Sequence, residues 1–561
     1  MATINFKGKE IVRNHHLTIP YHELVPDAKK SLSNPSTGSG RGKPSLNDNL
    51  IIHGDNLLAL KALLPTYAGK VKCIYIDPPY NTGNEKWAYN DNVNSPMMRD
   101  WLGKVVDKDD LTRHDKWLCM MMPRLKLLRE LLRDDGVIFM SIDDSELGNL
   151  RLLVDEVFGE ENFIEQFVIR SNPRGNQAKK FTASVHEYIL LYAKSKNSIS
   201  PLGFQVEEEN YEKVDEEGRK YREIGLRKRG AGARREDAPN QYFPIYFNPN
   251  SGKISLSQID KHYIKILPKL SDGSDGRWRW AKNTIEEEKD NLIVRLVRRN
   301  GTEEYDVFEK DYHYVGKISK ITSIFYEKEV NYENATEELK EIFGKKVFDY
   351  PKPAHLVKKI IQSLQFKEGY ILDSFAGTGT TAHATLALNR EDGGNRKFIL
   401  VEMEDYADKI TAERVRRVIK GVKGAKDENL QKGLGGSFSY YELGKPIDTE
   451  RILKGKDLPT FAEMARYIFY TATGEEFNGK KINEKTGFIG ESKEYQVYLL
   501  YKPDMEYLKS IALTLERAET LGKFTGKKRL VFAPAKYLDQ EHLKRYHIDF
   551  AQLPFEIYKK Q

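Results

Sequence analysis

Apolar positions along the chain alternate between short β-branched runs and longer stretches of helical spacing. Short apolar runs bounded by turn formers predict buried strands, and they lie at 50–53, 71–76 and 137–142. Apolar residues at helical spacing predict helices at 57–64, 116–133 and 146–158. Two further runs predict a strand pair at 163–170 and 186–193. This alternation predicts a mostly parallel, doubly wound α/β sheet.

The pattern changes near residue 195 and returns near residue 370. Between these points the chain is charged and irregular, with short aromatic segments. The α/β pattern then resumes, with a helix at 354–364 and strands at 370–373 and 397–401. Segments at 458–470, 496–501 and 530–534 predict a separate small α/β module.

Three polar stretches interrupt these elements. Residues 29–48 are rich in Ser, Gly, Pro and Lys, and we expect a mobile linker there, with ordered structure resuming at Asn49. Residues 82–115 are long for a connection and predict a lid or a substrate grip. Residues 420–437 are rich in Lys and Gly and predict a hinge. The resulting division is an arm and linker (1–48), a first catalytic half (49–195), an insert (196–345), a second half (346–425) and a C-terminal domain (426–561).

Composition narrows the class of protein. The chain has 561 residues and a formal net charge of +7, which permits an anionic partner without requiring one. Its two cysteines, Cys73 and Cys119, lie in apolar stretches and predict buried thiols, and no zinc-ligand spacing occurs, so we expect no metal. No signal peptide and no run of ~18 apolar residues is present. We therefore expect a soluble cytoplasmic protein.

The first candidate site directly follows the strand at 71–76. It reads Asp77-Pro78-Pro79-Tyr80, with Asn81 next. Ligands of open α/β sheets gather beyond the carboxyl ends of the strands, and proline lacks an N–H and fixes φ, which holds the Pro78 carbonyl in place. The Asp77 carboxylate and the Pro78 carbonyl can each accept one hydrogen of an exocyclic amine, while Tyr80 stacks on a flat ring. The alternative is a strand that simply ends in a proline-rich turn.

The second candidate site is a glycine-rich turn between a strand and a helix. Asp373 ends the strand, and Gly377 and Gly379 allow the backbone to turn sharply and to approach a ligand. Glu402 ends the next strand, where an acid can bind ribose hydroxyls. The loop also fits a dinucleotide fingerprint, so a nicotinamide or flavin site is a rival. Asp373, Phe375 within the loop and the Asp-Pro-Pro-Tyr motif count against that rival.

Basic residues are concentrated in and near the insert. One run spans residues 227–235, and Arg277-Trp278-Arg279-Trp280 interleaves cations with aromatic rings. Either run alone is typical of a solvated loop, but two such runs favour a nucleic-acid surface, because arginine binds phosphates and reads guanine edges. The candidate DNA-binding residues are Arg174, Arg227, Lys228, Arg229, Arg234, Arg235, Arg277 and Arg279.

These motifs resemble those of a known family. Asp-Pro-Pro-Tyr resembles the signature of DNA amino-methyltransferases that use S-adenosylmethionine, where Asp is typical of adenine-N6 enzymes and Ser of cytosine-N4 enzymes. The glycine turn resembles the cofactor loop of that family, with Ser374 in place of its usual Pro. The order, with Asp-Pro-Pro-Tyr first, then the insert, then the glycine loop, resembles the beta class. The segments at 77–84, 158–163 and 349–353 look most like modification (Mod) subunits of type III restriction-modification systems.

The resemblance covers residues 49–420 and implies a fold, a cofactor and site residues. The implied fold is a Rossmann-like methyltransferase sheet with a circularly permuted motif order and an inserted target-recognition domain. The implied cofactor is S-adenosylmethionine. The implied catalytic residues are Asp77, Pro78, Pro79, Tyr80 and Asn81. The implied cofactor-binding residues are Asp55, Lys352, Asp373, Phe375, Gly377, Gly379, Thr380 and Glu402.

Four of the cofactor-binding residues carry specific expectations from the resemblance. Asp55 lies beside the adenine of the cofactor, or serves only as a helix N-cap. Lys352 meets the carboxylate of the methionine portion. Phe375 covers the adenine or the sulfonium with its ring face. Glu402 binds the ribose.

The implied reaction is methyl transfer to the N6 amine of a flipped adenine in double-stranded DNA. The implied partners are DNA, a second copy in a homodimer and a separate helicase-nuclease restriction subunit, with no membrane. Two alternatives of other kinds stay open. One is a DNA-recognition subunit without essential catalysis, and the other is a methyltransferase that acts on cytosine N4, on RNA or on a protein amine.

Overall fold

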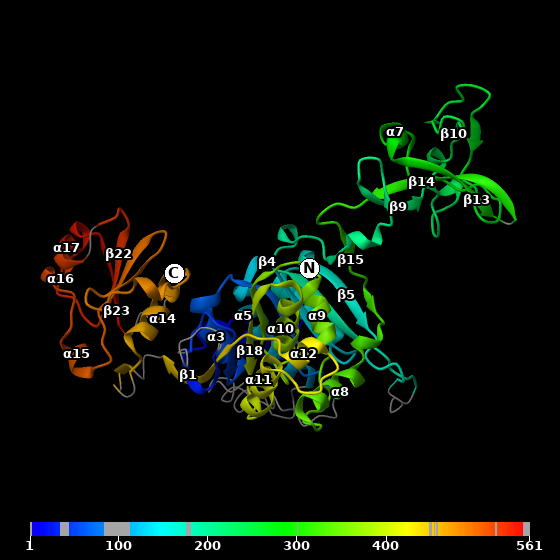
Figure 1. Cartoon of the computed structure of the whole chain (residues 1–561). Coiled ribbons are helices and arrows are strands. Elements are labelled where there is room, and N and C mark those ends of the chain that lie inside the picture. The colour runs from blue at the N-terminus through cyan, green and yellow to red at the C-terminus, as the bar shows by residue number, and fades with distance from the viewer. Residues whose placement is uncertain are drawn as a thin grey trace. The chain divides into compact units, whose positions relative to one another are not determined.

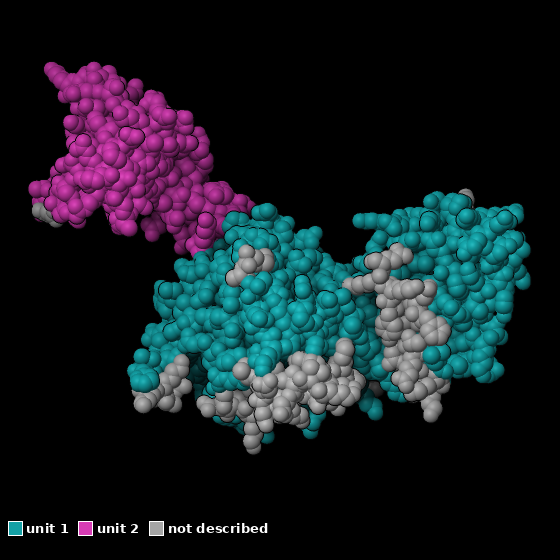
Figure 2. Space-filling view, turned by 180° about the vertical axis from the view of Figure 1, so that it is seen from behind, with its two compact units in different colours: residues 1–202, 321–561 teal, residues 203–320 magenta. Residues whose placement is uncertain are grey.

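The structure is a computed structural model, and it describes residues 3–33, 44–82, 113–175, 181–299, 301–447, 452–453, 455, 458–521 and 524–553. Two compact units are present, one formed by residues 203–320 and the other by the rest of the chain (Figure 2). No helix among the described residues has the length and apolar character needed to cross a bilayer. Most of the predicted grip at 82–115 lies outside the described residues.

The larger unit is built on one ten-stranded sheet. In spatial order its strands are β1 (Tyr21–Leu32), β19 (Phe438–Ile447), β2 (Leu50–His53), β18 (Asn395–Glu402), β17 (Glu368–Asp373), β3 (Val71–Ile76), β4 (Leu132–Ile142), β6 (Glu187–Ala193), β5 (Phe163–Ile169) and β16 (Ile324–Phe325). The six strands from β19 to β4 are parallel, whereas β1 and β6 run antiparallel to their neighbours β19 and β4.

Helices cover both faces of this sheet (Figure 1). One face packs on α3 (Asn56–Tyr67), α5 (Arg113–Leu131) and α6 (Leu147–Phe158), and the other on α9 (Ala354–Gln362), α10 (Thr380–Asp392) and α11 (Glu413–Lys420). In β3, Ile74 belongs to the first core, and Cys73 and Tyr75 belong to the second, because successive strand residues point to opposite faces. The predicted doubly wound sheet is confirmed.

Two segments expected to be mobile are structured. Lys29 to Leu32 belong to β1, which pairs with β19 at the edge of the sheet; residues 34–43 of the predicted linker lie outside the described residues. The predicted hinge contains α12 (Glu428–Lys432) and contributes Leu430 to a buried core. A Cβ on Gly421 would lie 2.7 Å from the Gln431 carbonyl oxygen. Glycine at this position lets the chain near residue 421 pass close to the backbone near residue 431, so the glycines serve close packing here and not a hinge.

The smaller unit has a core of its own. A four-stranded sheet runs in the order β13 (Leu292–Arg299), β14 (Thr302–Tyr312), β9 (Lys220–Gly225) and β8 (Lys213–Val214), and a second sheet contains β10 (Ile245–Phe247), β11 (Ile254–Ser255) and β12 (Ile264–Ile266). Its core includes Phe243, Ile245, Trp278 and Val307, with Ile285 from α7 (Lys282–Glu287). The chain enters and leaves through the paired strands β7 (Gly203–Gln205) and β15 (Ile318–Lys320).

The insert expected at 196–345 is therefore longer than the separate unit. β16 pairs with β5 of the large sheet. The following helix α8 (Tyr332–Phe343) is tied to α11 by an ion pair between Glu338 and Arg414. Both elements belong to the larger unit because their apolar residues pack on its core.

The C-terminal part is a small α/β module, as predicted. Its sheet runs β20 (Phe488–Glu491), β21 (Tyr495–Leu499), β22 (Lys528–Ala533) and β23 (Ile548–Gln552). Its helices are α14 (Phe461–Thr473), α15 (Met505–Ser510), α16 (Leu515–Thr520) and α17 (Gln540–Arg545). Tyr467 of α14 packs on Tyr21 of β1, with ring centroids 4.5 Å apart, so the module adjoins the N-terminal strand.

Candidate active site

The site lies where four adjacent parallel strands end. β2, β18, β17 and β3 are neighbours in the sheet, and their carboxyl ends lead to Asp55, Glu402, Asp373 and Asp77. β17 is hydrogen-bonded directly to β3, with Leu372 paired to Ile74. The two motifs, roughly three hundred residues apart in sequence, therefore lie side by side.

Asp77 presents one engaged and one free carboxylate oxygen. Its Oδ2 lies 2.7 Å from the Nζ atom of Lys352. Its Oδ1 is buried and has no hydrogen-bond partner among the residues that the structure describes. The indole of Trp117 donates to the Pro79 carbonyl over 2.7 Å, which fixes the turn. A buried acceptor without a donor is costly unless a ligand supplies one.

Tyr80 is held through its hydroxyl. It donates to Glu187 Oε2 over 2.8 Å, and the hydroxyl of Tyr332 donates to the same oxygen over 2.6 Å. Burial raises the pKa of both tyrosines well above the usual value, so each stays a donor. Burial also raises the pKa of Glu187, although Lys352 opposes that shift. The Tyr80 ring is thus fixed at one end beside Asp77.

Asn81 faces the protein interior. Its backbone is left-handed, with φ of 56°. Its amide donates to the buried carboxylate of Glu146, which also binds the Nδ1 atom of His114 at 2.7 Å and the amide of Asn149 at 2.7 Å. Asn81 therefore anchors the end of the Asp-Pro-Pro-Tyr segment.

The glycine loop is organised by two buried acids. Asp373 accepts the N–H of Phe375 at 3.0 Å and the hydroxyl of Thr381 at 2.6 Å. Burial raises the pKa of Asp373 to about 7, and the charge of Asp77 adds to the shift. Glu402 accepts the N–H of Gly377 at 2.7 Å, and burial raises its pKa to about 7 as well.

The loop leaves room for a ligand beside its backbone. Gly377 and Gly379 have φ of 51° and 79°, in the left-handed region that favours glycine. A Cβ on Gly377 would find no atom nearer than the Phe375 carbonyl oxygen at 4.0 Å, whereas one on Gly379 would press on the Thr411 carbonyl at 3.1 Å. Ser374 Oγ is buried without a partner within the described part of the chain. These residues fit a nucleoside-bearing cofactor.

The other predicted cofactor residues differ in the contacts that they make. Asp55 caps α3 by accepting the N–H groups of Leu57 and Leu58 at 2.8 and 3.2 Å. The Thr380 hydroxyl donates to the Lys352 carbonyl at 3.2 Å. Phe375 is 4% exposed and belongs to the main core. The Lys352 ammonium, predicted to meet the methionine carboxylate of the cofactor, lies 2.7 Å from Asp77 Oδ2.

Most of the predicted DNA-binding arginines of the insert form bonds within the smaller unit. Arg227 pairs with the buried Asp306 at 3.1 Å, and Arg235 with Asp275 at 3.2 Å. Arg279 pairs with Glu309, and Arg277 donates to the Gly232 carbonyl. Trp278 is fully buried in the core of this unit.

Four predicted DNA-binding residues are held by fewer ion pairs or are more exposed. Lys228, Arg229 and Arg234 form no ion pair with any residue in the described ranges. Arg174, in the larger unit, is 83% exposed and pairs with Glu333 at 3.3 Å. These side chains are the better placed of the predicted set to meet a phosphate.

Sequence reasoning missed several residues of the site. Glu187 begins β6, and because β6 is antiparallel to β4, its first residue lies at the edge where the parallel strands end. Arg414 is buried and donates to the hydroxyls of Thr378 and Thr380 at 2.8 Å each, while Glu338 binds it at 2.8 Å. An acid at the start of a strand that runs antiparallel to β4, the neighbour of the motif strand β3, was the available signal for Glu187. No local signal marks Arg414.

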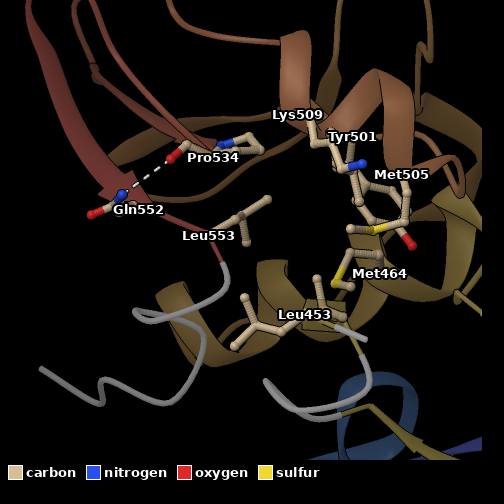
Figure 3. Close-up of a pocket in the computed structure, with 10 residues that line it drawn as sticks. Leu453, Met464, Tyr501, Met505, Lys509, Pro534, Gln552 and Leu553 are labelled. Carbon is tan, nitrogen blue, oxygen red and sulfur yellow. Dashed lines mark hydrogen bonds between the residues drawn. The ribbon is translucent and has the colours of Figure 1, made fainter. Parts of the chain in front are cut away.

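A separate apolar cavity of about 200 Å³ lies in the C-terminal module (Figure 3). Met464, Tyr501, Met505 and Leu553 are among its lining residues. None of the predicted site residues lines it, so it belongs to a different part of the protein.

Comparisons with known proteins agree with this geometry. A family model described as DNA methylase matches residues 71–413. The Mod subunit of the type III restriction-modification enzyme EcoPI from Escherichia phage P1 is 34% identical, over 76% of this chain and 70% of that protein. The type II methyltransferase M.KpnI of Klebsiella pneumoniae is 39% identical, over 62% of this chain and 79% of that protein.

Two further similarities are lower in sequence identity. The StyLTI Mod subunit of Salmonella typhimurium is 27% identical, over 99% of this chain and 84% of that protein. The solved structure of the cytosine-N4-specific PvuII DNA methyltransferase is 13% identical and matches 65% of this chain and 86% of that one, with a TM-score of 0.30. The family match and the identity to the EcoPI Mod subunit show that this chain belongs to the DNA methylase family.

Proposed function

We propose that this DNA methylase is a site-specific adenine methyltransferase that transfers the methyl group of S-adenosylmethionine to the N6 amine of a flipped adenine in double-stranded DNA. The observation that carries the proposal is the buried, unpartnered Oδ1 of Asp77, one strand away from the glycine loop. An acceptor there matches an amine hydrogen. The Asp form of the motif favours adenine over cytosine as the target base.

The protein activates the amine by positioning it. Asp77 Oδ1 accepts one amine hydrogen and the Pro78 carbonyl accepts the other, which favours a pyramidal nitrogen and aims its lone pair. When bound, S-adenosylmethionine supplies an electrophilic methyl group. Glu402 accepts ribose hydroxyls, and Gly377 lets the backbone lie close to the nucleoside. Fixed dipoles and orientation then account for the rate.

No protein nucleophile is needed. Both cysteines are buried, and burial raises the pKa of Cys73 and of Cys119 to about 12, which keeps both thiols protonated. A thiol is a poor nucleophile without ionisation. Transfer is therefore a direct displacement at the methyl carbon.

The target base leaves the helix to react. Asp77 lies just beyond the carboxyl end of β3, and an amine inside a duplex is paired and stacked. Flipping costs a few kcal/mol of unstacking. Tyr80, fixed by its hydroxyl to Glu187, provides a ring face on which the base stacks.

The chain acts as the modification subunit of a type III restriction-modification system. Its similarity to Mod subunits along most of its length supports this role. DNA is the substrate, a helicase-nuclease restriction subunit is a partner, and the enzyme works as a homodimer in the cytoplasm. We assign these protein contacts to the C-terminal module.

The test is methylation of DNA by the purified chain. The wild-type protein, with S-adenosylmethionine and plasmid DNA, should produce N6-methyladenine in one sequence context, read by methylation-sensitive sequencing. Asp77→Ala should lower transfer to background while S-adenosylhomocysteine binds with unchanged affinity. Methylation of cytosine N4, or of RNA alone, would overturn the assigned substrate, and full turnover by Asp77→Ala would remove the assigned role.

A further inference from the structure

The side chain of Lys352 lies against the carboxylates of Asp77 and Glu187. Its Nζ lies 2.7 Å from Asp77 Oδ2 and 3.8 Å from Glu187 Oε2. It also lies over the rings of Tyr80 and Tyr332, 4.8 and 4.9 Å from their centroids. The side chain is 9% exposed. A buried ammonium needs such compensation from carboxylates and ring faces.

The charge of Lys352 is maintained by its partners. Burial lowers the pKa of Lys352, but the Asp77 and Glu187 carboxylates outweigh it and leave the pKa above its ordinary value. Lys352 therefore stays protonated beside Asp77. Glu187 balances that cation while it accepts hydrogen bonds from Tyr80 and Tyr332.

The main chain of Lys352 contacts the other half of the site. Its carbonyl accepts the hydroxyl of Thr380, the first residue of α10 after the glycine loop, at 3.2 Å. Arg414 holds the same hydroxyl at 2.8 Å and is itself held by Glu338. One residue thus contacts Asp77 through its side chain and the glycine loop through its backbone.

We propose that Lys352 is a positioning residue that orients Asp77 toward the target amine and ties this acceptor to the cofactor loop, and that it is not a ligand of the cofactor carboxylate. This inference rests on the proposed function. The terminal torsion of aspartate is broad, so a partner at Oδ2 selects one orientation of the carboxylate. Oδ1 is then left as the acceptor for the amine.

The two roles of Lys352 predict different ligand preferences. S-adenosylhomocysteine carries the amino-acid carboxylate, whereas 5′-methylthioadenosine lacks it. A residue that binds the amino-acid carboxylate contributes to the affinity for the first compound only. A residue that orients Asp77 contributes to the affinity for neither compound. Its loss lowers the rate of methyl transfer instead.

The experiment compares Lys352→Met with Lys352→Arg in the full chain. Lys352→Met should bind both compounds within about twofold of wild type, because the hydrogen bond between Lys352 and the loop is made by the Lys352 carbonyl. Its kcat should fall about 100-fold, as expected for a misplaced reacting group. Lys352→Arg should recover part of kcat. Lys358→Met is the matched control and should change neither quantity, because Lys358 lies on α9 and its ammonium pairs with Glu391 of α10 at 2.7 Å.

Specific results would overturn the proposal. A loss of affinity for S-adenosylhomocysteine but not for 5′-methylthioadenosine would make Lys352 a carboxylate ligand, and an unchanged kcat would exclude a positioning role. If Lys352→Met does not fold, Glu187→Gln replaces it. That variant keeps an acceptor for both tyrosines and should lower kcat with S-adenosylhomocysteine affinity unchanged; a wild-type kcat would count against the proposal.

The same data separate this proposal from the function on which it rests. A wild-type chain that methylates no DNA would contradict the proposed function. The comparison of the two ligands needs no turnover, so it would still decide whether Lys352 meets the carboxylate.

Discussion

Glu402 combines burial with a direct bond to the glycine loop. Its carboxylate accepts the N–H groups of Gly377 and Glu404 at 2.7 and 3.0 Å. Burial nevertheless raises its pKa to about 7, since desolvation outweighs these bonds. A substantial fraction of the free protein therefore carries a protonated Glu402 at neutral pH.

The protonation of Glu402 predicts a pH dependence of cofactor binding. Ribose hydroxyls donate to the ionised carboxylate, so the bound form has a lower pKa than the free form with its value near 7. Affinity for S-adenosylhomocysteine should consequently rise as pH increases through about 7 and level off above it. Calorimetry at pH 6, 7 and 8, in buffers of different ionisation enthalpy, should also detect proton release on binding.

Replacement of the carboxyl group provides the control. Glu402→Gln should bind more weakly at pH 8 and with a flatter dependence on pH. A wild-type pH dependence in that variant would assign the titration to another group, of which Asp373, with its own pKa raised to about 7, is the first candidate.

Residues were predictable where they stood in contiguous motifs. Asp77, Asp373, Gly377 and Glu402 were identified as candidates because each ends or follows a strand and carries a group suited to the proposed chemistry. Lys352 was identified as a site residue, but its position depends on Glu187, which tertiary structure brings from a different strand. No spacing in the sequence encodes that contact.

At the scale of elements, α3 depends on a single cap. Asp55 accepts two N–H groups of its first turn, and loss of such a cap costs about 1 kcal/mol. Asp55→Ala should therefore speed amide exchange in α3 about fivefold, measured by hydrogen–deuterium exchange. Asp134→Ala, whose side chain is 87% exposed, is the control.

The same variant decides whether Asp55 also meets the cofactor. Unchanged S-adenosylhomocysteine affinity would leave it a cap only, and a loss well beyond that of the control would add the second role. Wild-type exchange in α3 would contradict the cap itself.

Strands were predicted well where both faces are buried, as in β2 and β3, because a short apolar run bounded by turns is typical of a buried strand. β1 was missed because it is an edge strand, whose backbone bonds to β19 are compatible with polar side chains. The β13–β14 hairpin was missed although Asn300-Gly301 between its strands is a strong turn signal. The many charged residues of both strands obscured their alternation of apolar and polar positions.

At the scale of the whole molecule, the smaller unit does not carry the basic excess of the chain. Residues 203–320 contain 23 Lys and Arg against 22 Asp and Glu. Many of these charges pair with one another inside the unit, as Arg227 does with Asp306. Recognition by this unit would depend on a few placed side chains rather than on a general positive field.

The attachment of the smaller unit permits a clean excision. Gly203 pairs with Lys320 across β7 and β15, so the chain enters and leaves at adjacent points. Replacing residues 204–319 with a short Gly-Ser turn should leave the ten-stranded sheet intact, because none of its strands lies in that range. The excised protein should bind S-adenosylhomocysteine like the wild type and should lose methylation of the target sequence.

Calorimetry and methylation-sensitive sequencing measure both outcomes on one preparation. Retained ligand binding with lost methylation would assign target recognition to the smaller unit and the cofactor site to the larger one. Methylation of the same sequence by the excised protein would instead place recognition on the larger unit, where Arg174 is exposed. Loss of ligand binding would mean that the glycine loop after β17 depends on the smaller unit. That result would contradict the contact between Arg414 and Thr380, which holds the loop from within the larger unit.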